Sequence, residues 1–469
     1  MNDVNEMGTA HRLDPSILRA YDVRGIVGET LTTGDARALG RAFATTIRRE
    51  GGARVALGYD GRLSSPDLAA AVADGLCAGG VDVLDIGRGP TPMLYFAVHE
   101  TEADGGIQVT GSHNPPEHNG FKLMRGLETL HGDAIQELGR IAAEGAYTDG
   151  SGQRHAMPVH DRYVARVLAD APGRGGLRVA WDPGNGATGA VLAEVLAGLP
   201  GEHHVINGEV DGRFPAHHPD PTVPENLEQL RATVQERGCD LGFAFDGDGD
   251  RLGVVDRQGR VLWGDEIMLL IARDILADRP GAPIIADVKA SRVLFDGIAE
   301  AGGEPVMGRT GHSLVKAEMR RRSAPFAGEM SAHLFFADRW YGFDDGLYAA
   351  VRVLDILART DQDLAAFKDS LPAVANTPEI RIPCDGSRKW AAIAEAEQRL
   401  AEAGAQVTAI DGVRVDTADG WWLLRASNTQ DVLVARCEGW DADALERLKA
   451  AVSDQLTRSG VAVPAELAA

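Results

Sequence analysis

The feature that most constrains this chain is an apolar run that ends in three aspartates. Gly242–Phe245 is predicted to form a buried strand, and Asp246, Asp248 and Asp250 follow it, separated by single glycines and succeeded by Arg251. Glycine lets the backbone turn sharply enough for alternate carboxylates to converge. Such carboxylates repel one another unless a cation lies between them, and Mg²⁺ prefers oxygen ligands of this kind. The sequence therefore predicts a magnesium site at the end of a buried strand.

Two other interpretations of this acidic loop are a solvated turn and a calcium-binding loop. Asp and Gly are common turn residues, so a solvated acidic turn is the simplest alternative, although ordinary turns seldom carry three alternating carboxylates. An EF-hand does not fit, because its sixth position would be Arg251 instead of Gly and its twelfth Arg257 instead of Glu.

Composition limits the class of protein. The chain has 469 residues and 44% hydrophobic content, which at about 150 residues per domain suggests about three domains. A net charge of -22 argues against a nucleic-acid or anionic-membrane partner. The four cysteines are far apart, and neither a signal pattern nor a membrane-length apolar run occurs, so we expect free thiols in a cytoplasmic, soluble protein.

Helical and apolar extended stretches alternate along most of the chain. This order is typical of α/β domains with mostly parallel sheets, whose ligands bind beyond the carboxyl ends of the strands. The last part differs, because a hairpin is predicted through residues 412–424. We therefore predict three α/β domains and a smaller C-terminal α+β domain. Their predicted limits are 1–157, 158–261, 262–371 and 372–469.

Ser112 follows another predicted strand. Gly106–Thr110 delivers Ser112, His113 and Asn114 into a turn that Gly111 and Pro115 should hold fixed and exposed. This is a suitable place for a nucleophilic or phosphorylated hydroxyl, although most serines in turns bond only to their own backbone. Lys122, one of only six lysines, lies within reach of the same loop.

Three further motifs have two interpretations each. Gly184–Gly189 fits the dinucleotide pattern Gly-x-Gly-x-x-Gly, or it is a glycine turn that lets a helix pack close to its strand. Glu329, Ser331 and His333 alternate, so an extended segment would point all three side chains one way, or leave them on a solvated strand edge. Arg425, with the hydroxyl and amide donors that follow it, suits a phosphate, but a capped turn would use the same residues.

Four separated motifs together resemble the α-D-phosphohexomutase superfamily, specifically bacterial phosphomannomutase/phosphoglucomutase. The resemblance covers essentially the whole chain, and the four motifs occur in the order found in that family. They are Thr110-Gly-Ser-His-Asn-Pro115, Asp246-Gly-Asp-Gly-Asp-Arg251, Gly328-Glu-Met-Ser-Ala-His333 and Arg425-Ala-Ser-Asn-Thr429.

The resemblance implies a role for each site residue. Ser112 would be the phosphoserine, and its phosphate would complete a Mg²⁺ site formed by Asp246, Asp248 and Asp250. Glu329 and Ser331 would read the sugar hydroxyls. The clamp for the phosphate that is not transferred would consist of Arg425, Ser427, Asn428 and Thr429. The residues that would line the cleft are Tyr21, Arg24, Lys122, Arg251, Lys289, His312 and His333.

The implied reaction is the reversible interconversion of mannose or glucose 1-phosphate and 6-phosphate. A glucose or mannose 1,6-bisphosphate would be both intermediate and activator, and would turn over within the cleft. Lys122 and Arg251 can neutralise charge during transfer. His312 and His333 are candidates for the general acid and base, a role that Arg24 and Lys122 could share. A Pro-containing break at Ser370–Thr377 is the predicted hinge of the last domain.

Other expectations concern specificity and partners. By the resemblance, Met330 favours mannose and glucose over glucosamine 6-phosphate, since enzymes for the latter usually have glutamine there. Ala332 stands where the mannose/glucose group usually has glycine. We expect phosphosugar substrates, no nucleic-acid or membrane partner, and a monomer or weak homo-oligomer. The alternatives are a phosphoglucosamine mutase, a haloacid-dehalogenase-like sugar phosphatase with an aspartate nucleophile, and a non-catalytic sugar-phosphate binding protein.

Overall fold

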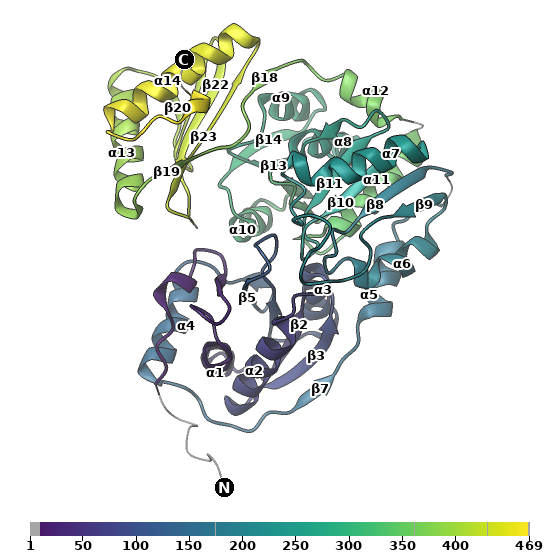
Figure 1. The fold of residues 1–469 in the computed structure, drawn as a ribbon, viewed down its shortest axis with the longest axis vertical. Coiled ribbons are helices and arrows are strands. Elements are labelled where there is room, and N and C mark those ends of the chain that lie inside the picture. Colours follow the sequence, from purple (N-terminus) through teal and green to yellow (C-terminus); the bar gives the residue numbers. More distant parts are fainter. Residues whose placement is uncertain (1–9, 174, 361, 429, 468–469) are drawn as a thin grey trace.

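The computed structural model describes residues 10–467 except 174, 361 and 429. Within these residues the chain forms four sheets in succession, and helices pack on them (Figure 1). The predicted architecture of three α/β domains and a C-terminal domain is confirmed. No helix in the described part of the chain combines the length and apolar character needed to cross a membrane.

The first sheet has the strand order β1-β5-β4-β2-β3-β7, with β6 paired to β5. β2 runs parallel to β3 and β4, whereas β5 is antiparallel to both β1 and β4. The strands are β1 (Val23–Ile26), β2 (Arg54–Tyr59), β3 (Asp82–Arg88), β4 (Gly105–Val109), β5 (His118–Arg125), β6 (Glu128–Thr129) and β7 (Arg154–Ala156). The helices are α1 (Thr33–Arg49), α2 (Ser65–Ala78), α3 (Thr91–Thr101) and α4 (Asp133–Glu144). β7 pairs with β3 and forms an edge of this sheet.

The second sheet has the order β12-β11-β10-β8-β9. β8 is parallel to β9 and β10, and β10 forms a hairpin with β11 in which Phe245 pairs with Leu252. The strands are β8 (Arg178–Asp182), β9 (Glu202–Val205), β10 (Leu241–Phe245), β11 (Leu252–Asp256) and β12 (Val261–Leu262). The helices are α5 (His160–Leu168), α6 (Gly189–Gly198) and α7 (Glu228–Arg237). The hairpin turn holds the three aspartates, as the apolar run predicts.

The third sheet has the order β14-β13-β15-β16-β17, parallel on one side and antiparallel on the other. Its strands are β13 (Pro283–Asp287), β14 (Glu304–Gly308), β15 (Phe326–Gly328), β16 (Leu334–Phe336) and β17 (Phe343–Asp344). The helices are α8 (Gly264–Asp278), α9 (Arg292–Glu300), α10 (His312–Arg322), α11 (Gly346–Thr360) and α12 (Leu364–Asp369).

The fourth sheet is antiparallel and has the order β18-β23-β22-β21-β20, with β19 paired to β23. β21 and β22 form the hairpin predicted through residues 412–424. The strands are β18 (Ala375–Asn376), β19 (Ile380–Pro383), β20 (Gln406–Thr408), β21 (Val413–Thr417), β22 (Gly420–Ala426) and β23 (Val432–Gly439). The helices α13 (Gly386–Glu402) and α14 (Ala442–Arg458) pack against this sheet.

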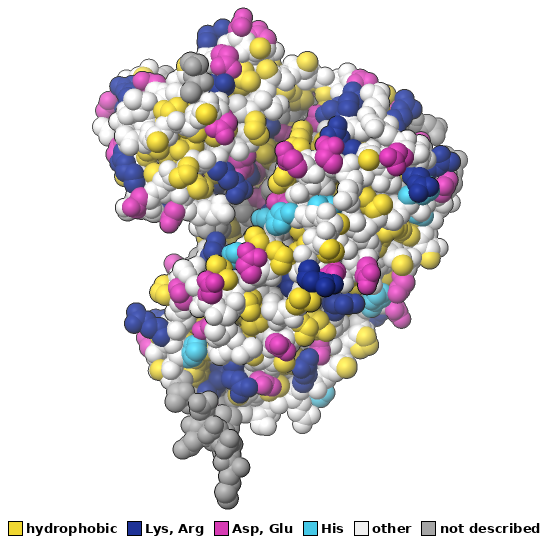
Figure 2. Space-filling view, in the orientation of Figure 1, with side chains coloured by type: hydrophobic (Ala, Val, Ile, Leu, Met, Phe, Trp, Pro, Cys, Tyr) yellow, Lys and Arg dark blue, Asp and Glu magenta, His cyan; other side chains and the backbone are white. Residues whose placement is uncertain are grey.

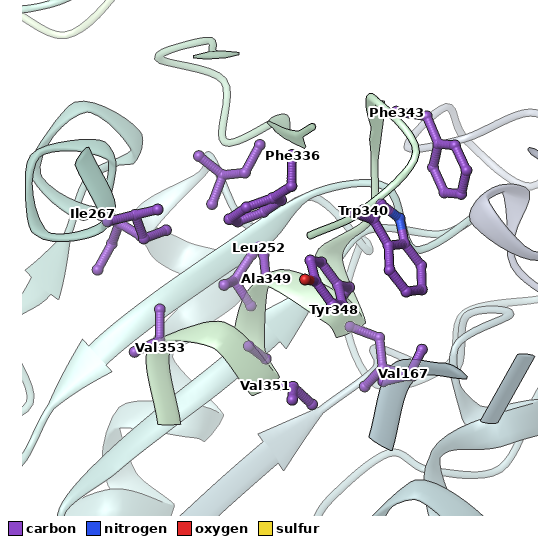
Figure 3. Close-up of a cluster of buried hydrophobic side chains, with 14 of the residues drawn as sticks. Val167, Leu252, Ile267, Phe336, Trp340, Phe343, Tyr348, Ala349, Val351 and Val353 are labelled. Atoms are coloured by element: carbon purple, nitrogen blue, oxygen red, sulfur yellow. The ribbon is translucent and has the colours of Figure 1, made fainter. Parts of the chain in front are cut away.

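The second and third α/β units share one hydrophobic core. Leu252 of β11, Phe336 of β16 and Val351 of α11 belong to the same buried cluster (Figure 3). Trp340 stacks on Tyr348 within it, with ring centroids 4.0 Å apart. The C-terminal domain has a core of its own, formed by its sheet and helices. This division leaves the last domain with fewer apolar ties to the rest of the molecule.

A hollow lies between the C-terminal domain and the first domain at the edge of the molecule. Figure 2 shows it as a notch whose walls carry basic, acidic and histidine side chains. The ends of β4, β10 and β13 supply loops to this region, as expected for ligand sites in parallel sheets. These loops carry Ser112, the three aspartates and Lys289, and other segments supply most of the remaining candidate site residues.

Candidate active site

The Ser112 loop is the first component of the site. The chain leaves β4 at Val109, and Ser112 adopts a left-handed backbone conformation with a φ of 49°. The Ser112 hydroxyl donates to Asp246 Oδ2 at 3.0 Å and lies 3.2 Å from His113 Nδ1. The turn is exposed at residues 115–117, but the expectation that it exposes Ser112 is wrong, because only 2% of Ser112 is accessible. The acidic loop of the second domain and the Arg62 side chain pack against this turn.

The three aspartates converge as predicted. Carboxylate oxygens of Asp246, Asp248 and Asp250 all lie within 4.8 Å of one another, and all three residues are fully buried. Lys122 of β5 donates to Asp248 Oδ2 at 2.7 Å and also contacts Asp250. Burial opposes the charge on Lys122, but the two carboxylates outweigh it and hold the pKa of Lys122 well above its ordinary value.

This cluster fits a divalent cation. Asp248 Oδ1 and Asp250 Oδ1 are buried and have no hydrogen-bond partner among the described residues. Burial, together with the charges of Asp250 and Asp248, raises the pKa of Asp246 well above its ordinary value. When all three carboxyl groups are ionised, they and the Lys122 ammonium carry two net negative charges, which a divalent cation would balance. The donor set is the all-oxygen one that Mg²⁺ prefers.

The glycine motif of the second domain supports the acidic loop. Ala187 N donates to Gly247 O at 2.9 Å, and a Cβ on Gly186 would lie 2.9 Å from the same oxygen. The turn therefore needs glycine in order to lie directly under the aspartates. This packing favours the glycine-turn interpretation over dinucleotide binding.

The motif that carries Glu329, Ser331 and His333 is a tight hairpin between β15 and β16. Ala332 N donates to Glu329 O at 2.9 Å, and Glu329 N donates to His333 O at 2.9 Å. The expectation of an extended segment with three side chains on one face is wrong. Ala332 has a φ of 69°, which reverses the chain where an alternating pattern suggests a strand.

His333 lies between two acids and an arginine. Its Nδ1 is 2.9 Å from Asp344 Oδ2 and 3.4 Å from Asp250 Oδ1, whereas its Nε2 accepts from Arg251 Nε at 3.1 Å. This geometry suits the neutral tautomer with the proton on Nδ1. Burial opposes ionisation of Asp344, but Lys316 and His333 hold the pKa of that carboxyl well below its usual range.

His312 begins α10 and stacks beside His333, with ring centroids 6.1 Å apart. Its Nδ1 is buried without a partner among the described residues. Burial and the neighbouring Lys316 lower the pKa of His312 well below its ordinary value. The preceding amide, Gly311 N, donates to Glu329 Oε1 at 2.6 Å, so Glu329 also anchors the start of this helix.

Residues predicted to bind substrate join three domains. The Tyr21 hydroxyl donates to Thr310 O at 3.0 Å and accepts from Asn428 Nδ2 at 2.6 Å. Arg425 forms two hydrogen bonds with Asp411, of 3.1 and 3.2 Å. Asp411 also accepts from Thr310 N at 3.0 Å. Through Asp411, Arg425 is thus linked to the loop that precedes His312.

The remaining predicted residues are placed as follows. Arg24 of β1 donates to Asn114 Oδ1 at 2.8 Å, beside Ser112. Lys289 follows β13, and its Nζ lies 3.1 Å from Glu379 Oε2 of the C-terminal domain. Ser331 is half-buried in the hairpin and Ser427 is buried after β22. Thr429 lies outside the described residues.

Several functional neighbours escaped the sequence-based prediction. Asp344 and Lys316 contact each other at 3.2 Å beside His333, and Thr91 donates to Asp248 at 2.5 Å. Asp60 and Arg62 hold the Ser112 loop. Asp60 and Asp344 lie at the ends of strands β2 and β17, and this position at a strand end is the sequence feature that could have identified them as site residues.

Four family models match the chain in order. They are described as phosphoglucomutase/phosphomannomutase, alpha/beta/alpha domain I at residues 15–146, domain II at 161–259 and domain III at 263–374, and the C-terminal domain at 379–455. Each of the four motifs lies inside a different matched segment.

Individual proteins are similar over nearly the full length. A phosphomannomutase/phosphoglucomutase of Pseudomonas aeruginosa is 43% identical over 456 residues, covering 97% of this chain and 98% of that protein. A phosphoglucomutase of Neisseria gonorrhoeae is 44% identical over 441 residues, covering 92% and 95%. A crystal structure of a phosphoglucomutase/phosphomannomutase family protein from Burkholderia thailandensis has a TM-score of 0.91 and 43% identity, covering 96% of this chain and 100% of that one.

Proposed function

The chain belongs to the phosphoglucomutase/phosphomannomutase family and is a mutase that interconverts hexose phosphates, and we propose that Ser112 carries the phosphoryl group. One observation carries this proposal: the Ser112 hydroxyl lies 3.0 Å from Asp246, and the loop of Asp246 contains two further buried carboxylates. A nucleophile and a cation site are thereby adjacent. Family membership excludes the alternatives of an aspartate-nucleophile phosphatase and a non-catalytic binding protein.

The metal is proposed to be Mg²⁺, held by Asp246, Asp248, Asp250 and a phosphate on Ser112. When bound, it would neutralise charge on the transferring phosphoryl group. Lys122 holds an ammonium group between two of these carboxylates and close to the Ser112 loop. Phosphoryl transfer depends mainly on positioning and charge neutralisation, so Lys122 and Arg24 are proposed to steady the phosphate oxygens.

His333 is the proposed group that takes the proton from the attacking sugar hydroxyl. Asp344 fixes its Nδ1, which leaves Nε2 as the nitrogen able to accept a proton. Arg251 Nε occupies that nitrogen at 3.1 Å, so a sugar hydroxyl would take the place of this contact. His312 is less suited to the task, because burial and Lys316 lower its pKa. We propose that His312 and Arg251 instead contact the substrate.

The sugar 1,6-bisphosphate is the proposed intermediate and activator. It must present first one phosphate and then the other to Ser112, while the second phosphate is held by Arg425, Ser427, Asn428 and Thr429. Glu329 and Ser331 are proposed to read the hydroxyls that both orientations share, with Tyr21 and Lys289 at the rim. Reorientation requires the last domain to open, and its separate core supports such movement. We place the hinge in the segment 370–374, since Thr377 is already bonded to β23.

Mannose and glucose phosphates are the proposed substrates. The Pseudomonas aeruginosa relative is named for both sugars, and the Neisseria gonorrhoeae relative for glucose. Met330, in the sugar-reading hairpin, supports this preference over glucosamine phosphates. The domain limits, a cytoplasmic location and a monomeric or weakly oligomeric state stay predictions.

The proposal is tested with glucose 1-phosphate and mannose 1-phosphate in assays coupled to each 6-phosphate product, with Mg²⁺ and trace bisphosphate. Ser112→Ala is expected to abolish turnover, and intact-mass measurement should find a bisphosphate-dependent phosphate on wild type but not on this variant. Ser453→Ala, a helix-surface serine of α14 that bonds to Lys449 O, is the matched control. Undiminished turnover by Ser112→Ala would overturn the proposal. Turnover of glucosamine 1-phosphate in preference to both sugars would favour the phosphoglucosamine alternative.

A further inference from the structure

Arg62 is a buried arginine that organises the Ser112 loop. It is 1% exposed, and its two terminal nitrogens donate to four backbone carbonyls. Nη1 reaches Pro115 O at 2.6 Å and His118 O at 3.0 Å, while Nη2 reaches Ser112 O at 2.7 Å and Asn114 O at 2.5 Å. All four terminal N–H groups of the guanidinium are therefore used by one loop, which is wrapped around the side chain.

Asp60 holds the other side of the same loop. One of its oxygens accepts from Thr110 Oγ1 at 2.8 Å and from Gly111 N at 3.2 Å. Thr110 Oγ1 in turn accepts from Ser112 N at 2.8 Å. The Arg62 Nε lies 3.3 Å from Asp60 Oδ2, so the two side chains form one buried ion pair. Backbone groups on both sides of Ser112 are thus tied, directly or through Thr110, to the Asp60–Arg62 pair.

The loop needs such a template because Ser112 is in the left-handed region that favours glycine. Two backbone bonds stabilise the turn from within, Asn114 N to Gly111 O and His118 N to Pro115 O. Neither bond uses the N–H or the C=O of Ser112 itself. The contact from Arg62 Nη2 to Ser112 O fixes the residue that carries the nucleophile.

We propose that Arg62, paired with Asp60, is a positioning residue for phosphoryl transfer, which aims the Ser112 hydroxyl at the acidic loop. The inference rests on the proposed role of Ser112. Arg62 acts through the backbone, because its guanidinium contacts loop carbonyls, Asp60 and the ring of Phe214. Phe214 belongs to the second domain and lies 5.0 Å from the guanidinium, so the same side chain also meets the domain that supplies the aspartates.

The chemistry requires arginine in particular. A planar guanidinium offers paired N–H groups in a fixed fork, whereas a lysine ammonium offers three donors from one point. Arg62→Lys therefore keeps the charge but cannot bond all four carbonyls. A purely electrostatic role would survive this change, and a positioning role would not.

The matched control is Arg352→Lys. Arg352 is also 1% exposed, and it forms a two-pronged pair with Asp338 at 2.9 and 2.8 Å, away from the Ser112 loop. Both variants remove a buried guanidinium, so both are expected to lower the melting temperature. Only the Arg62 variant is expected to change phosphoryl transfer per folded molecule.

The experiment measures kcat, KM and the rate at which trace bisphosphate places a phosphate on Ser112, read by intact mass. Arg62→Lys is expected to lower kcat and the phosphorylation rate about ten- to a hundredfold, the cost of a misplacement near 1 Å, with KM within about threefold. Arg352→Lys is expected to match wild type in all three. Equal phosphorylation rates in wild type and Arg62→Lys would overturn the inference. If wild type itself takes no phosphate on Ser112, the proposed function fails, and the inference fails with it.

A second variant covers the case in which Arg62→Lys does not fold. Arg62→Ala leaves a space beside a surface pocket of about 440 Å³ that Arg62 lines together with residues 209–213. Added guanidinium ion is expected to restore its phosphorylation rate at least fivefold, whereas tetramethylammonium, which cannot donate hydrogen bonds, should not. Asp60→Asn, which keeps the shape of the partner, is expected to slow phosphorylation as well. Absence of guanidinium rescue together with a wild-type rate in Asp60→Asn would refute the positioning role.

Discussion

Gly247→Ala tests whether the contact between the Ser112 loop and the acidic loop sets the rate. A Cβ at Gly247 would lie 2.3 Å from Ser112 O and 3.2 Å from the attached carbon, whereas ordinary Cβ contacts begin near 3.4 Å. The backbone conformation of Gly247 is not left-handed, so alanine adds a contact without adding backbone strain. The two loops must therefore separate by about 1 Å, which is the difference between the 2.3 Å contact and an ordinary contact of 3.4 Å.

That separation has a calculable consequence. The Ser112 hydroxyl lies 3.0 Å from Asp246 Oδ2, and a further 1 Å would break this hydrogen bond. Misplacing a reacting group by about 1 Å can cost about a hundredfold in rate, or about 2.7 kcal/mol of activation free energy. We therefore expect Gly247→Ala to lower kcat about a hundredfold in the coupled glucose 1-phosphate assay. KM should change less, because the residues proposed to read the sugar belong to the third domain and those proposed to hold the second phosphate belong to the fourth.

Gly176→Ala is the control, since no atom lies within 4 Å of the added carbon. Its kcat and melting temperature should equal those of wild type. A Gly247→Ala enzyme that folds and retains kcat within about threefold of wild type would show that the spacing of the two loops does not limit phosphoryl transfer.

Three further predictions concern strain, protonation and metal. Ala332→Gly should raise the free energy of unfolding by about 0.5–1 kcal/mol, because a left-handed φ of 69° disfavours alanine. The denaturant midpoint should rise accordingly, and an unchanged or lower midpoint would contradict this. Burial raises the pKa of Asp345 to about 7, so its stabilising protonation is complete below its ordinary pKa of 3.8 and is lost as the pH rises through about 7. Between pH 4 and 8, the free energy of unfolding of wild type should accordingly fall by up to about 4 kcal/mol relative to that of Asp345→Asn. Denaturant midpoints measure this difference, and parallel pH profiles of the two proteins would refute the raised pKa. Chelation should remove nearly all mutase activity and Mg²⁺ should restore it, while activity that persists in excess chelator would exclude the metal role.

The site components that were predicted from sequence are those that depend on local patterns. An apolar run followed by spaced aspartates specifies a strand and the loop at its end, and both Asp246 and Asp250 lie where that pattern puts them. The hairpin of β21 and β22 in the last domain was likewise predicted from a local sequence pattern. Parallel strands then bring distant loops to one edge of each sheet, which explains why the motifs converge.

One error concerns contacts between distant segments, and the other concerns a turn without the usual turn-forming residues. Burial of Ser112 depends on Arg62, fifty residues earlier, and on Asp246, 134 residues later, and nothing in the local sequence specifies those partners. The Glu329–His333 segment was mistaken for a strand because its turn contains no glycine or proline. Its left-handed residue is Ala332, which sequence propensity does not mark as a turn former.

The charge of the chain also needs a local interpretation. A net charge of -22 argues against polyanionic partners, yet the substrates of this family are phosphate esters. Three of the six lysines, at positions 122, 289 and 316, are buried near the site. Surface charges act through water and salt, which screen them beyond about 8 Å at physiological ionic strength. Buried cations are screened much less, so a few of them in the right place can select a small dianion that the surface as a whole would repel.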